Sequence, residues 1–454
     1  MEITKFVNRK EELGNLENLW ETNKAQFVVV YGRRRVGKTE LIKRFTNNKE
    51  SIYFFAKLES EKEQLSNLSS FFGDFFNDDV IKKSPLTSWD SVFEYLHRHN
   101  KKLIFVIDEF PNIVQSPRIL SVMQQYWDEK LKNSKIFLIL CGSSLSMMER
   151  YIFDYKTPIY GRRTFDLKLP PLKLKDTRDF FPDLSLEERI KIYSVLGGTP
   201  SYLLEFSKNI DNTIVNIVKK RSFLYREPEF VLREEVKEPR YFMSILHALS
   251  TGINTVGEIV NHTGIDKGIV GKYLSILIDL DLVGREVSIT ESWKSRKSLY
   301  FLKDNFFNFW FRFVYSNLQQ LEYGTDSFLY VFKKNFNTYL GFIFEKICKE
   351  FLIENSGLLP FRFTKLGRWW YKDKEIDLVA LNEETKEIGF FECKWKDLKE
   401  KEARKILREL KQKSKFVDWN LDKRKEYFGL IGKKIEGKNK LRKDGYLVFD
   451  LKDF

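Results

Sequence analysis

The chain has 454 residues, too many for one ordinary hydrophobic core, and its length predicts two or three domains. A composition of 43% hydrophobic and 15% aromatic residues excludes a disordered or low-complexity protein. The net charge is +14, with 18 Lys and Arg against 11 Asp and Glu in residues 397–454; this basic end favours a polyanion as partner, although a charge-rich helix face is the alternative.

Four short apolar segments alternate with polar, helix-like stretches in residues 1–175. The expected strands are 26–31, 51–55, 103–107 and 136–140, and a helix is expected to begin at Lys38. Buried strands that alternate with helices form a parallel sheet covered on both faces. These residues are therefore predicted to form an α/β domain.

The next two segments are expected to be mostly helical. Residues 176–238 have helical periodicity, broken at 197–200 by Gly-Gly-Thr-Pro, and predict a helical lid on the first domain. Residues 239–305 contain amphipathic segments at 241–250, 256–263 and 267–281. An alternating stretch with a polar turn follows at 283–302. Three helices followed by a β-hairpin indicate a winged helix.

The last two segments differ sharply in composition. Residues 306–338 are so aromatic that they are expected to form buried linker helices. Residues 339–454 are predicted to form a separate α/β domain. Its expected elements are a long helix to Asn355, strands near 361–371, 376–381 and 387–394, and a charged helix at 398–415.

No disulfide, zinc site or membrane segment is expected. The three cysteines, Cys141, Cys348 and Cys393, lie far apart without a metal-binding spacing. The first residues lack an apolar signal core, and no run approaches the roughly 18 apolar residues of a membrane span. We therefore expect a cytoplasmic protein.

A glycine-rich loop joins the first expected strand to the first expected helix. Residues 32–39 fit the pattern G-x-x-x-x-G-K-[ST]. Between a strand and a helix, this pattern is a phosphate-binding loop far more often than a glycine turn that matches by chance. In such a loop the backbone N–H groups bind phosphates, Lys38 neutralises the β- and γ-phosphates, and the Thr39 hydroxyl ligates Mg²⁺. The predicted ATP- and Mg²⁺-binding residues here are Gly32, Arg33, Arg34, Arg35, Val36, Gly37, Lys38, Thr39 and Glu40.

Polar residues follow the later strands of the same sheet. Asp108 is predicted to hold Mg²⁺ and Glu109 to polarise the attacking water, with a solvated acid pair as the alternative. Ser143, with Ser144, is a weaker candidate for sensing the γ-phosphate. Arg162 and Arg163 are candidates for a charge that meets the γ-phosphate in the transition state, or else form a surface pair.

The expected winged helix carries several basic residues. Lys267 and Lys272 fall on the expected recognition helix, and Lys294, Arg296 and Lys297 fall on the wing. Such charges suit contacts with DNA phosphates. Winged helices also act as internal packing modules, so both interpretations stay open.

Three acids and one lysine are expected to converge in residues 339–454. Alternation along a strand sends Glu392 and Lys394 to one face, and Asp377 begins the expected adjacent strand. With Glu345 on the long helix, Asp377 and Glu392 would bind Mg²⁺ and activate water while Lys394 orients it, which is the chemistry of phosphodiester hydrolysis. The alternative is a set of solvated charges.

Six motifs in order make residues 1 to about 320 resemble the archaeal-type ATPase family, a branch of the P-loop STAND/AAA+-like switches. The resemblance implies that Asn8, Arg9 and Pro200 border the adenine. The segment 295–300 also matches what this family places before its aromatic linker. The six motifs are residues 6–13, 31–39, 107–110, 142–144, 160–164 and 197–200.

Residues 339–454 resemble PD-(D/E)XK nucleases. The resemblance implies that Glu345, Asp377, Glu392 and Lys394 occupy that fold's catalytic positions, with Ile376-Asp377 in place of the usual Pro-Asp pair. The expected function is therefore an ATP-hydrolysing, Mg²⁺-dependent switch that acts on nucleic acid, DNA in the first instance, and gates a metal-dependent nuclease-like domain. The alternative is a regulatory ATPase whose last domain is an inactive DNA- or protein-binding scaffold. Homo-oligomerisation is left open.

Overall fold

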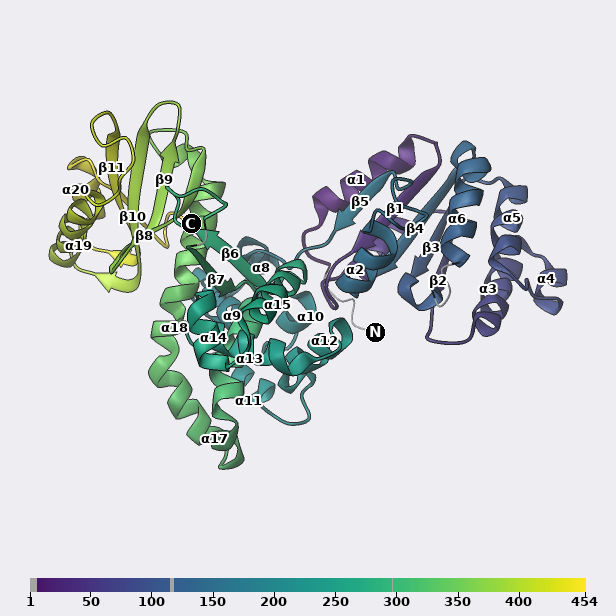
Figure 1. Cartoon of the computed structure of the whole chain (residues 1–454), viewed down its shortest axis with the longest axis horizontal. Helices are drawn as coiled ribbons and strands as arrows, with labels where there is room; N and C mark the ends of the chain where they lie inside the picture. Colours follow the sequence, from purple (N-terminus) through teal and green to yellow (C-terminus); the bar gives the residue numbers. More distant parts are fainter. Residues whose placement is uncertain (1–5, 115–117, 296) are drawn as a thin grey trace. The chain divides into compact units, whose positions relative to one another are not determined.

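The computed structural model describes residues 6–114, 118–295 and 297–454 (Figure 1). Arg296, one of the expected wing cations, therefore lies outside the described residues. The chain divides into two compact units. The first unit comprises residues up to 180 together with 198–204 and 229–237, and the second comprises 181–197, 205–228 and 238–454.

The first unit is built on a parallel five-stranded sheet. Its strands are β1 (Gln26–Tyr31), β2 (Ser51–Phe55), β3 (Leu103–Asp108), β4 (Ile136–Gly142) and β5 (Phe165–Lys168), in the order β2-β3-β4-β1-β5. The four expected strands and the parallel α/β sheet are confirmed. The fifth strand was not expected, because it is short and buries only Leu167 at the sheet edge.

Helices cover both faces of this sheet, because alternate strand residues point to opposite sides. On one face Leu41, Ile42 and Phe45 of α2 and Leu16 of α1 pack against the sheet. On the other face the core is formed with helices α3, α5 and α6. The helices of this unit are α1 (Lys10–Glu21), α2 (Lys38–Thr46), α3 (Glu61–Phe76), α4 (Asp79–Lys83), α5 (Trp89–His99), α6 (Arg118–Glu129), α7 (Leu145–Met148), α8 (Thr177–Phe180) and α10 (Pro200–Leu203).

The segment expected to form one helical lid, residues 176–238, is helical but does not form one body. Helix α10 and most of α12 (Glu227–Glu235) group with the first unit, whereas α9 (Leu186–Leu196) and α11 (Ile210–Ile217) group with the second. Helical periodicity reports that a face is buried and not which partner buries it. The five expected domains otherwise remain predictions.

The second unit contains the expected three helices and hairpin. Helices α13 (Pro239–Ser250), α14 (Val256–Thr263) and α15 (Lys267–Asp279) precede the antiparallel pair β6 (Val283–Val287) and β7 (Ser298–Leu302). Polar caps place the helix starts: Thr255 forms a capping box on α14, and the Asp266 carboxylate accepts from two N–H groups of α15.

The aromatic linker continues into the C-terminal domain without a break. After α16 (Asn305–Phe309), a π-helical turn (Trp310–Val314) and α17 (Leu318–Glu322), one helix, α18, runs from Thr325 to Glu354. The boundary expected at residues 338 and 339 therefore falls inside α18. Tyr339 and Leu340 are fully buried there, so the aromatic and C-terminal parts share a continuous buried stripe.

The C-terminal sheet has the strand order β12-β11-β10-β9-β8. Strands β8, β9 and β10 are antiparallel, and β10, β11 and β12 are parallel. Helix α18 packs on one face and α19 with α20 on the other. The elements are β8 (Lys365–Tyr371), β9 (Lys374–Asn382), β10 (Glu387–Leu398), α19 (Glu400–Ser414), β11 (Lys425–Ile435), α20 (Lys438–Lys443) and β12 (Leu447–Asp450). None of the helices in the described part of the chain is long and apolar enough to cross a membrane.

Candidate functional site

The phosphate loop, residues 32–39, connects β1 to α2 and depends on two glycines. Gly32 has φ 150° and Gly37 has φ 97°, conformations that side-chain-bearing residues rarely adopt. A Cβ at Gly32 would lie 2.5 Å from the Leu169 carbonyl oxygen. The loop thus packs against the chain after β5 in a form that glycine alone permits.

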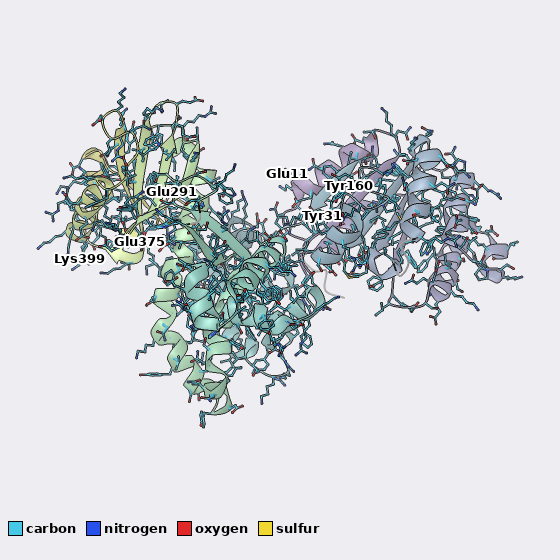
Figure 2. All side chains as sticks on the ribbon, in the orientation of Figure 1. Glu11, Tyr31, Tyr160, Glu291, Glu375 and Lys399 are labelled. Atoms are coloured by element: carbon cyan, nitrogen blue, oxygen red, sulfur yellow. The ribbon has the colours of Figure 1, made fainter. Side chains whose placement is uncertain are left out.

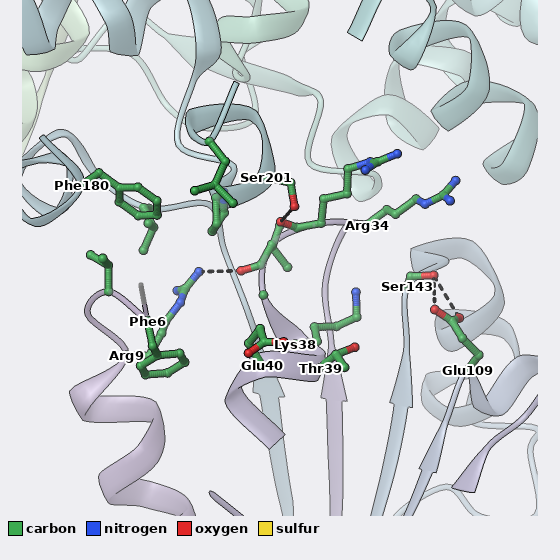
Figure 3. Close-up of a pocket in the computed structure, with 17 residues that line it drawn as sticks. Phe6, Arg9, Arg34, Lys38, Thr39, Glu40, Glu109, Ser143, Phe180 and Ser201 are labelled. Carbon is green, nitrogen blue, oxygen red and sulfur yellow. Dashed lines mark hydrogen bonds between the residues drawn. The ribbon is translucent and has the colours of Figure 1, made fainter. Parts of the chain in front are cut away.

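The loop forms one wall of a cavity of about 390 Å³ within the first unit (Figure 3). The polar part is lined by Arg34 to Glu40 of the loop and α2, with Glu109 and Ser143 from the ends of β3 and β4. The other part is apolar and includes Phe6, Val7, Leu172, Phe180, Pro200 and Leu204. A phosphate chain suits the first part and a flat base the second.

The Lys38 ammonium is held by the loop itself. Its Nζ donates to the carbonyl oxygens of Gly32 at 2.8 Å and Arg33 at 3.1 Å, and the side chain is buried. Burial lowers the pKa of Lys38, whereas Cys141, Glu109 and Asp108 act in the opposite direction. Phosphate oxygens, which carry full charge, are stronger acceptors for this ammonium than the two carbonyls.

Two oxygen groups suitable for Mg²⁺ meet beside the loop. The Thr39 hydroxyl donates to Asp108 Oδ2 at 3.2 Å, and the Tyr53 hydroxyl donates to the same oxygen. Burial and the Asp108 charge raise the pKa of Tyr53 well above its ordinary value, so it stays a neutral donor. Mg²⁺ prefers oxygen ligands and keeps several waters and phosphate oxygens, so a hydroxyl and one carboxylate fit its needs.

Glu109 and Ser143 face each other at the cavity wall (Figure 3). Ser143 Oγ lies 2.9 Å and 3.0 Å from the two Glu109 carboxylate oxygens and donates to them. Glu109 has a left-handed backbone, φ 54°, which turns its side chain away from the line of β3. The geometry makes Ser143 an orienting partner of Glu109, while its expected contact with a γ-phosphate stays a prediction.

The residues expected to border the adenine divide into two kinds. Arg9 and Pro200 line the cavity, and Arg9 Nη2 donates to the carbonyl oxygens of Val36 at 3.2 Å and Pro170 at 2.6 Å. Asn8 does not line it; its amide donates to Asp176 Oδ1 at 2.8 Å. Of the expected loop residues, Gly32 and Arg33 are not among those that line the cavity.

Arg162 and Arg163 are not brought to the cavity. Arg162 Nη2 lies 3.1 Å from Asp128 Oδ2, and Arg163 Nε lies 2.7 Å from a carboxylate oxygen of Asp166. The Arg163 guanidinium also lies over the Phe153 ring, and Tyr160 beside it is exposed (Figure 2). In this arrangement both arginines have local acidic partners, and their expected transition-state role stays a prediction.

Sequence reasoning missed most of the apolar wall of the cavity. Pro200 was expected there, and Phe6 and Val7 lie in the motif at residues 6–13 without an assigned role, but Leu172, Phe180 and Leu204 belong to no motif. Long-range folding brings them to the phosphate loop. Sequence reasoning also missed Glu235, which accepts from the Leu145 N–H in the segment that follows Ser143.

The four C-terminal residues do converge, and they form the carboxylate cluster of Glu345, Asp377, Glu392 and Lys394. The Lys394 Nζ lies 3.0 Å from Asp377 Oδ2 and 2.6 Å from Glu392 Oε2. Both carboxylates are buried, and Asp377 also accepts from the Cys393 N–H at 2.8 Å. The neighbouring Glu375, by contrast, is exposed (Figure 2).

The charges of this cluster perturb one another. Burial, reinforced by the Asp377 charge, raises the pKa of Glu345 to about 8. The same two causes raise the pKa of Glu392. Burial by itself lowers the pKa of Lys394, but Asp377 and Glu392 outweigh it and raise the pKa overall. A lysine thus bridges two acids, while burial and the nearby Asp377 charge favour the protonated form of the third.

A second lysine, which sequence reasoning missed, completes the cluster. Lys413 Nζ, from the last turn of α19, lies 2.7 Å from Glu392 Oε1. In the sequence, nothing but its place in a charged helix marks Lys413 as part of the cluster. In residues 6–114, 118–295 and 297–454, no group of three or more His, Cys, Asp or Glu is arranged as a metal site. A metal ion here would have to displace the Lys394 ammonium from between Asp377 and Glu392.

The expected DNA-contacting lysines are on the surface. Lys267 and Lys272 of α15 and Lys294 and Lys297 of the β6–β7 connection are all exposed. Lys297 has Glu291 nearby, 3.9 Å between Nζ and Oε1. Exposure leaves these lysines available for phosphates, and an internal packing role for the lysines themselves is disfavoured.

Three known families match successive parts of the chain. Residues 6–206 match an ATPase domain predominantly from Archaea. Residues 243–284 match bacterial regulatory proteins of the arsR family, which supports the helix-turn-helix assignment of α13 to α15. Residues 310–406 match archaeal and bacterial proteins of unknown function, and this match does not assign the C-terminal domain to a nuclease fold.

Relatives are found in Methanocaldococcus jannaschii. An uncharacterised protein from this archaeon is 41% identical over 99% of this chain and 100% of its own length. An uncharacterised ATP-binding protein of the same organism is 62% identical over 48 residues, 11% of this chain and 81% of that protein. Among solved structures, a Walker-type ATPase of Pyrococcus abyssi shares the fold with a TM-score of 0.53 at 21% identity, over 68% of this chain and 96% of that one.

Proposed function

The chain belongs to the same family as its full-length relative from Methanocaldococcus jannaschii and carries an archaeal ATPase domain, and on this premise we propose that it binds ATP with Mg²⁺ in the phosphate-loop cavity and hydrolyses it. The observation that carries the proposal is the cavity itself. It joins a polar part, with Lys38, Thr39, Glu109 and Ser143, to an apolar part that suits a base.

Each part of the cavity has a role in the proposed reaction. Lys38 leaves the loop carbonyls and binds the β- and γ-phosphates, and loop N–H groups bind the remaining phosphate oxygens. Thr39 and Asp108 would hold Mg²⁺, which supplies positive charge to the phosphates when bound. Glu109, oriented by Ser143, accepts a proton from the attacking water. Phe6 and Phe180 bound the space for adenine.

Two substitutions separate binding from turnover. Lys38→Ala should weaken ATP binding at least about tenfold, because a charge-assisted hydrogen bond contributes about 1.5–3 kcal/mol and 1.4 kcal/mol corresponds to a factor of ten. Glu109→Gln should bind ATP normally and lose turnover. Isothermal titration and a phosphate-release assay measure the two effects.

Lys43→Ala is the matched control, because Lys43 lies on the same helix with its side chain 61% exposed. It should behave as wild type in both assays. Wild-type ATP affinity in Lys38→Ala would show that the loop does not bind the phosphates.

We further propose that the nucleotide state controls an action on DNA. Exposed lysines on α15 and the β6–β7 connection, in a segment that matches arsR-type regulators, support DNA contact. The carboxylate cluster supports a second activity, metal-dependent cleavage of phosphodiester bonds, because placing three acids together, two of them buried, is costly unless cations offset them. The α18-β8-β9-β10-α19-β11 order is compatible with the PD-(D/E)XK interpretation.

The cleavage proposal is tested without nucleotide. Mn²⁺ should bind between Asp377 and Glu392, seen as anomalous density in soaked crystals and as heat in calorimetry. Plasmid cleavage should require the metal and vanish in Asp377→Ala and Lys394→Ala while ATP hydrolysis persists. Lys365→Ala, an exposed lysine paired with Glu383, serves as the control. Neither metal binding nor cleavage in the wild type would leave the domain as a binding scaffold.

A further inference from the structure

The acidic end of α12 makes two contacts, one with the phosphate loop and one with the segment after β4, and neither was expected from sequence. Residues 229–237 belong to the same compact unit as the phosphate loop, although they follow it by about two hundred positions. Glu234 contacts the loop and Glu235 contacts the segment after β4. The two neighbouring carboxylates therefore contact Arg34, which lines the cavity, and the segment that follows Ser143.

Glu235 is bound by a dense set of donors. Its Oε1 accepts from the Leu145 N–H at 3.0 Å, and its Oε2 accepts from the Ser146 N–H at 3.1 Å and the Ser146 hydroxyl at 2.7 Å. The Ser144 hydroxyl donates to Oε2 at 3.0 Å. One carboxylate thus takes four hydrogen bonds from three consecutive residues and fixes the start of α7.

The fixed segment leads directly to the catalytic carboxylate. Ser144 follows Ser143 in the chain, and Ser143 donates to both oxygens of Glu109. The backbone leaving β4 sets where the Ser143 hydroxyl can reach, since the two residues are adjacent. Glu235 does not line the cavity, so its effect on Glu109 passes through Ser144 and Ser143.

Glu234 adds a contact with the opposite wall. Arg34 Nη1 lies 2.7 Å from Glu234 Oε1, and both side chains are about half exposed. Arg34 also lines the cavity, where phosphates would attract it. An exposed ion pair contributes little free energy, so phosphates can take Arg34 from Glu234 without a large cost, while the four bonds to Glu235 remain.

We propose that Glu235 is a positioning residue for ATP hydrolysis, which holds the segment after β4 so that Ser143 keeps Glu109 in place. This inference rests on the proposed ATPase function and adds a residue from outside the phosphate loop and sheet. Glu235 acts on turnover and not on nucleotide affinity, because its hydrogen bonds go to residues 144–146 and none goes to the phosphate loop or to Asp108.

The test compares turnover, affinity and coupling to Ser143. In Glu235→Ala, kcat should fall on the order of tenfold, since small misplacements of a catalytic group cost much of its effect. The Kd for a slowly hydrolysed ATP analogue should stay within about threefold of wild type. In Glu235→Gln, one acceptor oxygen is retained, and kcat should lie between those of wild type and Glu235→Ala.

The double variant decides whether Glu235 works through Ser143. Starting from Ser143→Ala, a further Glu235→Ala change should alter kcat by less than about twofold, because residues in one chain of contacts are not additive. Glu238→Gln is the matched control: an exposed carboxylate three residues on, without a side-chain cap bond, which should leave kcat unchanged.

Three outcomes overturn the inference: unchanged kcat in Glu235→Ala, an undiminished effect of Glu235→Ala in the Ser143→Ala background, or full activity in Ser143→Ala. Should Glu235→Ala fail to fold, Glu235→Gln with a wild-type melting temperature carries the same test. Failure of the proposed function is distinct, since it appears as absence of ATP binding or hydrolysis by the wild-type chain itself.

Discussion

Individual charged side chains at both sites depend on their neighbours for their ionisation state. In the nucleotide cavity, burial lowers the pKa of Lys38, and two loop carbonyls take its hydrogen bonds. In the carboxylate cluster, burial raises the pKa of Glu345 to about 8, helped by Asp377 and opposed by Arg368 and Lys394. Bound nucleotide would offset the unfavourable burial of the Lys38 charge, and a bound divalent cation would offset that of the carboxylates.

The raised pKa of Glu345 predicts a pH-dependent stability. The ordinary value is 4.5, so between that value and about 8 the folded chain holds a proton that the unfolded chain has lost. The free energy of unfolding therefore falls as pH rises through this window. In Glu345→Gln this fall should be smaller by at least about 1 kcal/mol, since one unit of pKa shift corresponds to about 1.4 kcal/mol.

Denaturant titrations from about pH 5 to about pH 9 measure this difference. Glu384→Gln is the control, because Glu384 is an exposed carboxylate in the turn after β9, and it should change the pH profile little. Identical pH slopes for wild type and Glu345→Gln would mean that Glu345 ionises as freely in the folded chain as in the unfolded one.

At the scale of elements, the apolar wall of the nucleotide cavity depends on one close backbone approach. The Leu172 N–H donates to the Gly198 carbonyl oxygen at 2.8 Å. Leu172 itself and Pro200, two residues after Gly198, line the cavity. A Cβ on Gly198 would lie 1.9 Å from the Leu172 carbonyl oxygen, closer than any real contact. The start of α10 can therefore lie against residue 172 only with glycine at this position.

Gly198→Ala should destabilise the first unit and weaken nucleotide binding together. Overpacking typically costs about 1–3 kcal/mol, and here the displaced atoms are backbone. Calorimetric melting and ATP-analogue titration measure the two effects. Gly14→Ala in α1 is the matched control: nothing lies within 4 Å of its added Cβ, and alanine in a helix should stabilise by about 0.5–1 kcal/mol. Equal behaviour of the two variants would contradict the close approach.

At the scale of the whole molecule, the chain passes repeatedly between the two compact units. It leaves the first unit after residue 180, returns for 198–204 and again for 229–237, and then continues into the helix-turn-helix. Each unit has its own core, yet several covalent connections join them. These connections lead directly from the unit with the phosphate loop to α9, α11 and α13, which is the physical basis of the proposal that nucleotide state acts on the rest of the chain.

Much of the fold follows from local patterns in the sequence. The parallel strands 26–31, 51–55, 103–108 and 136–142 are mostly apolar, and two helices of the helix-turn-helix, α14 and α15, start at the polar caps Thr255 and Asp266. The two glycines on which the phosphate loop depends, Gly32 and Gly37, lie within one eight-residue motif. Strand alternation and chain order were enough to bring Asp377, Glu392 and Lys394 together. In each case the determining contacts lie close in sequence or repeat with a fixed period.

The tertiary structure alone decided what depends on contacts between distant residues. Strand β5 is formed by pairing with the edge of β1, a segment more than 130 positions earlier. Helix α18 continues through residue 339 because its aromatic face stays buried. Arg162 is a candidate for contact with the γ-phosphate, and the ion pair that it makes with Asp128, 34 positions away, could not be read from the sequence. Glu235 reaches the segment after β4 across about 90 positions. Local periodicity reports that a side chain is buried or charged, and the identity of its partner is set only when the whole chain has packed.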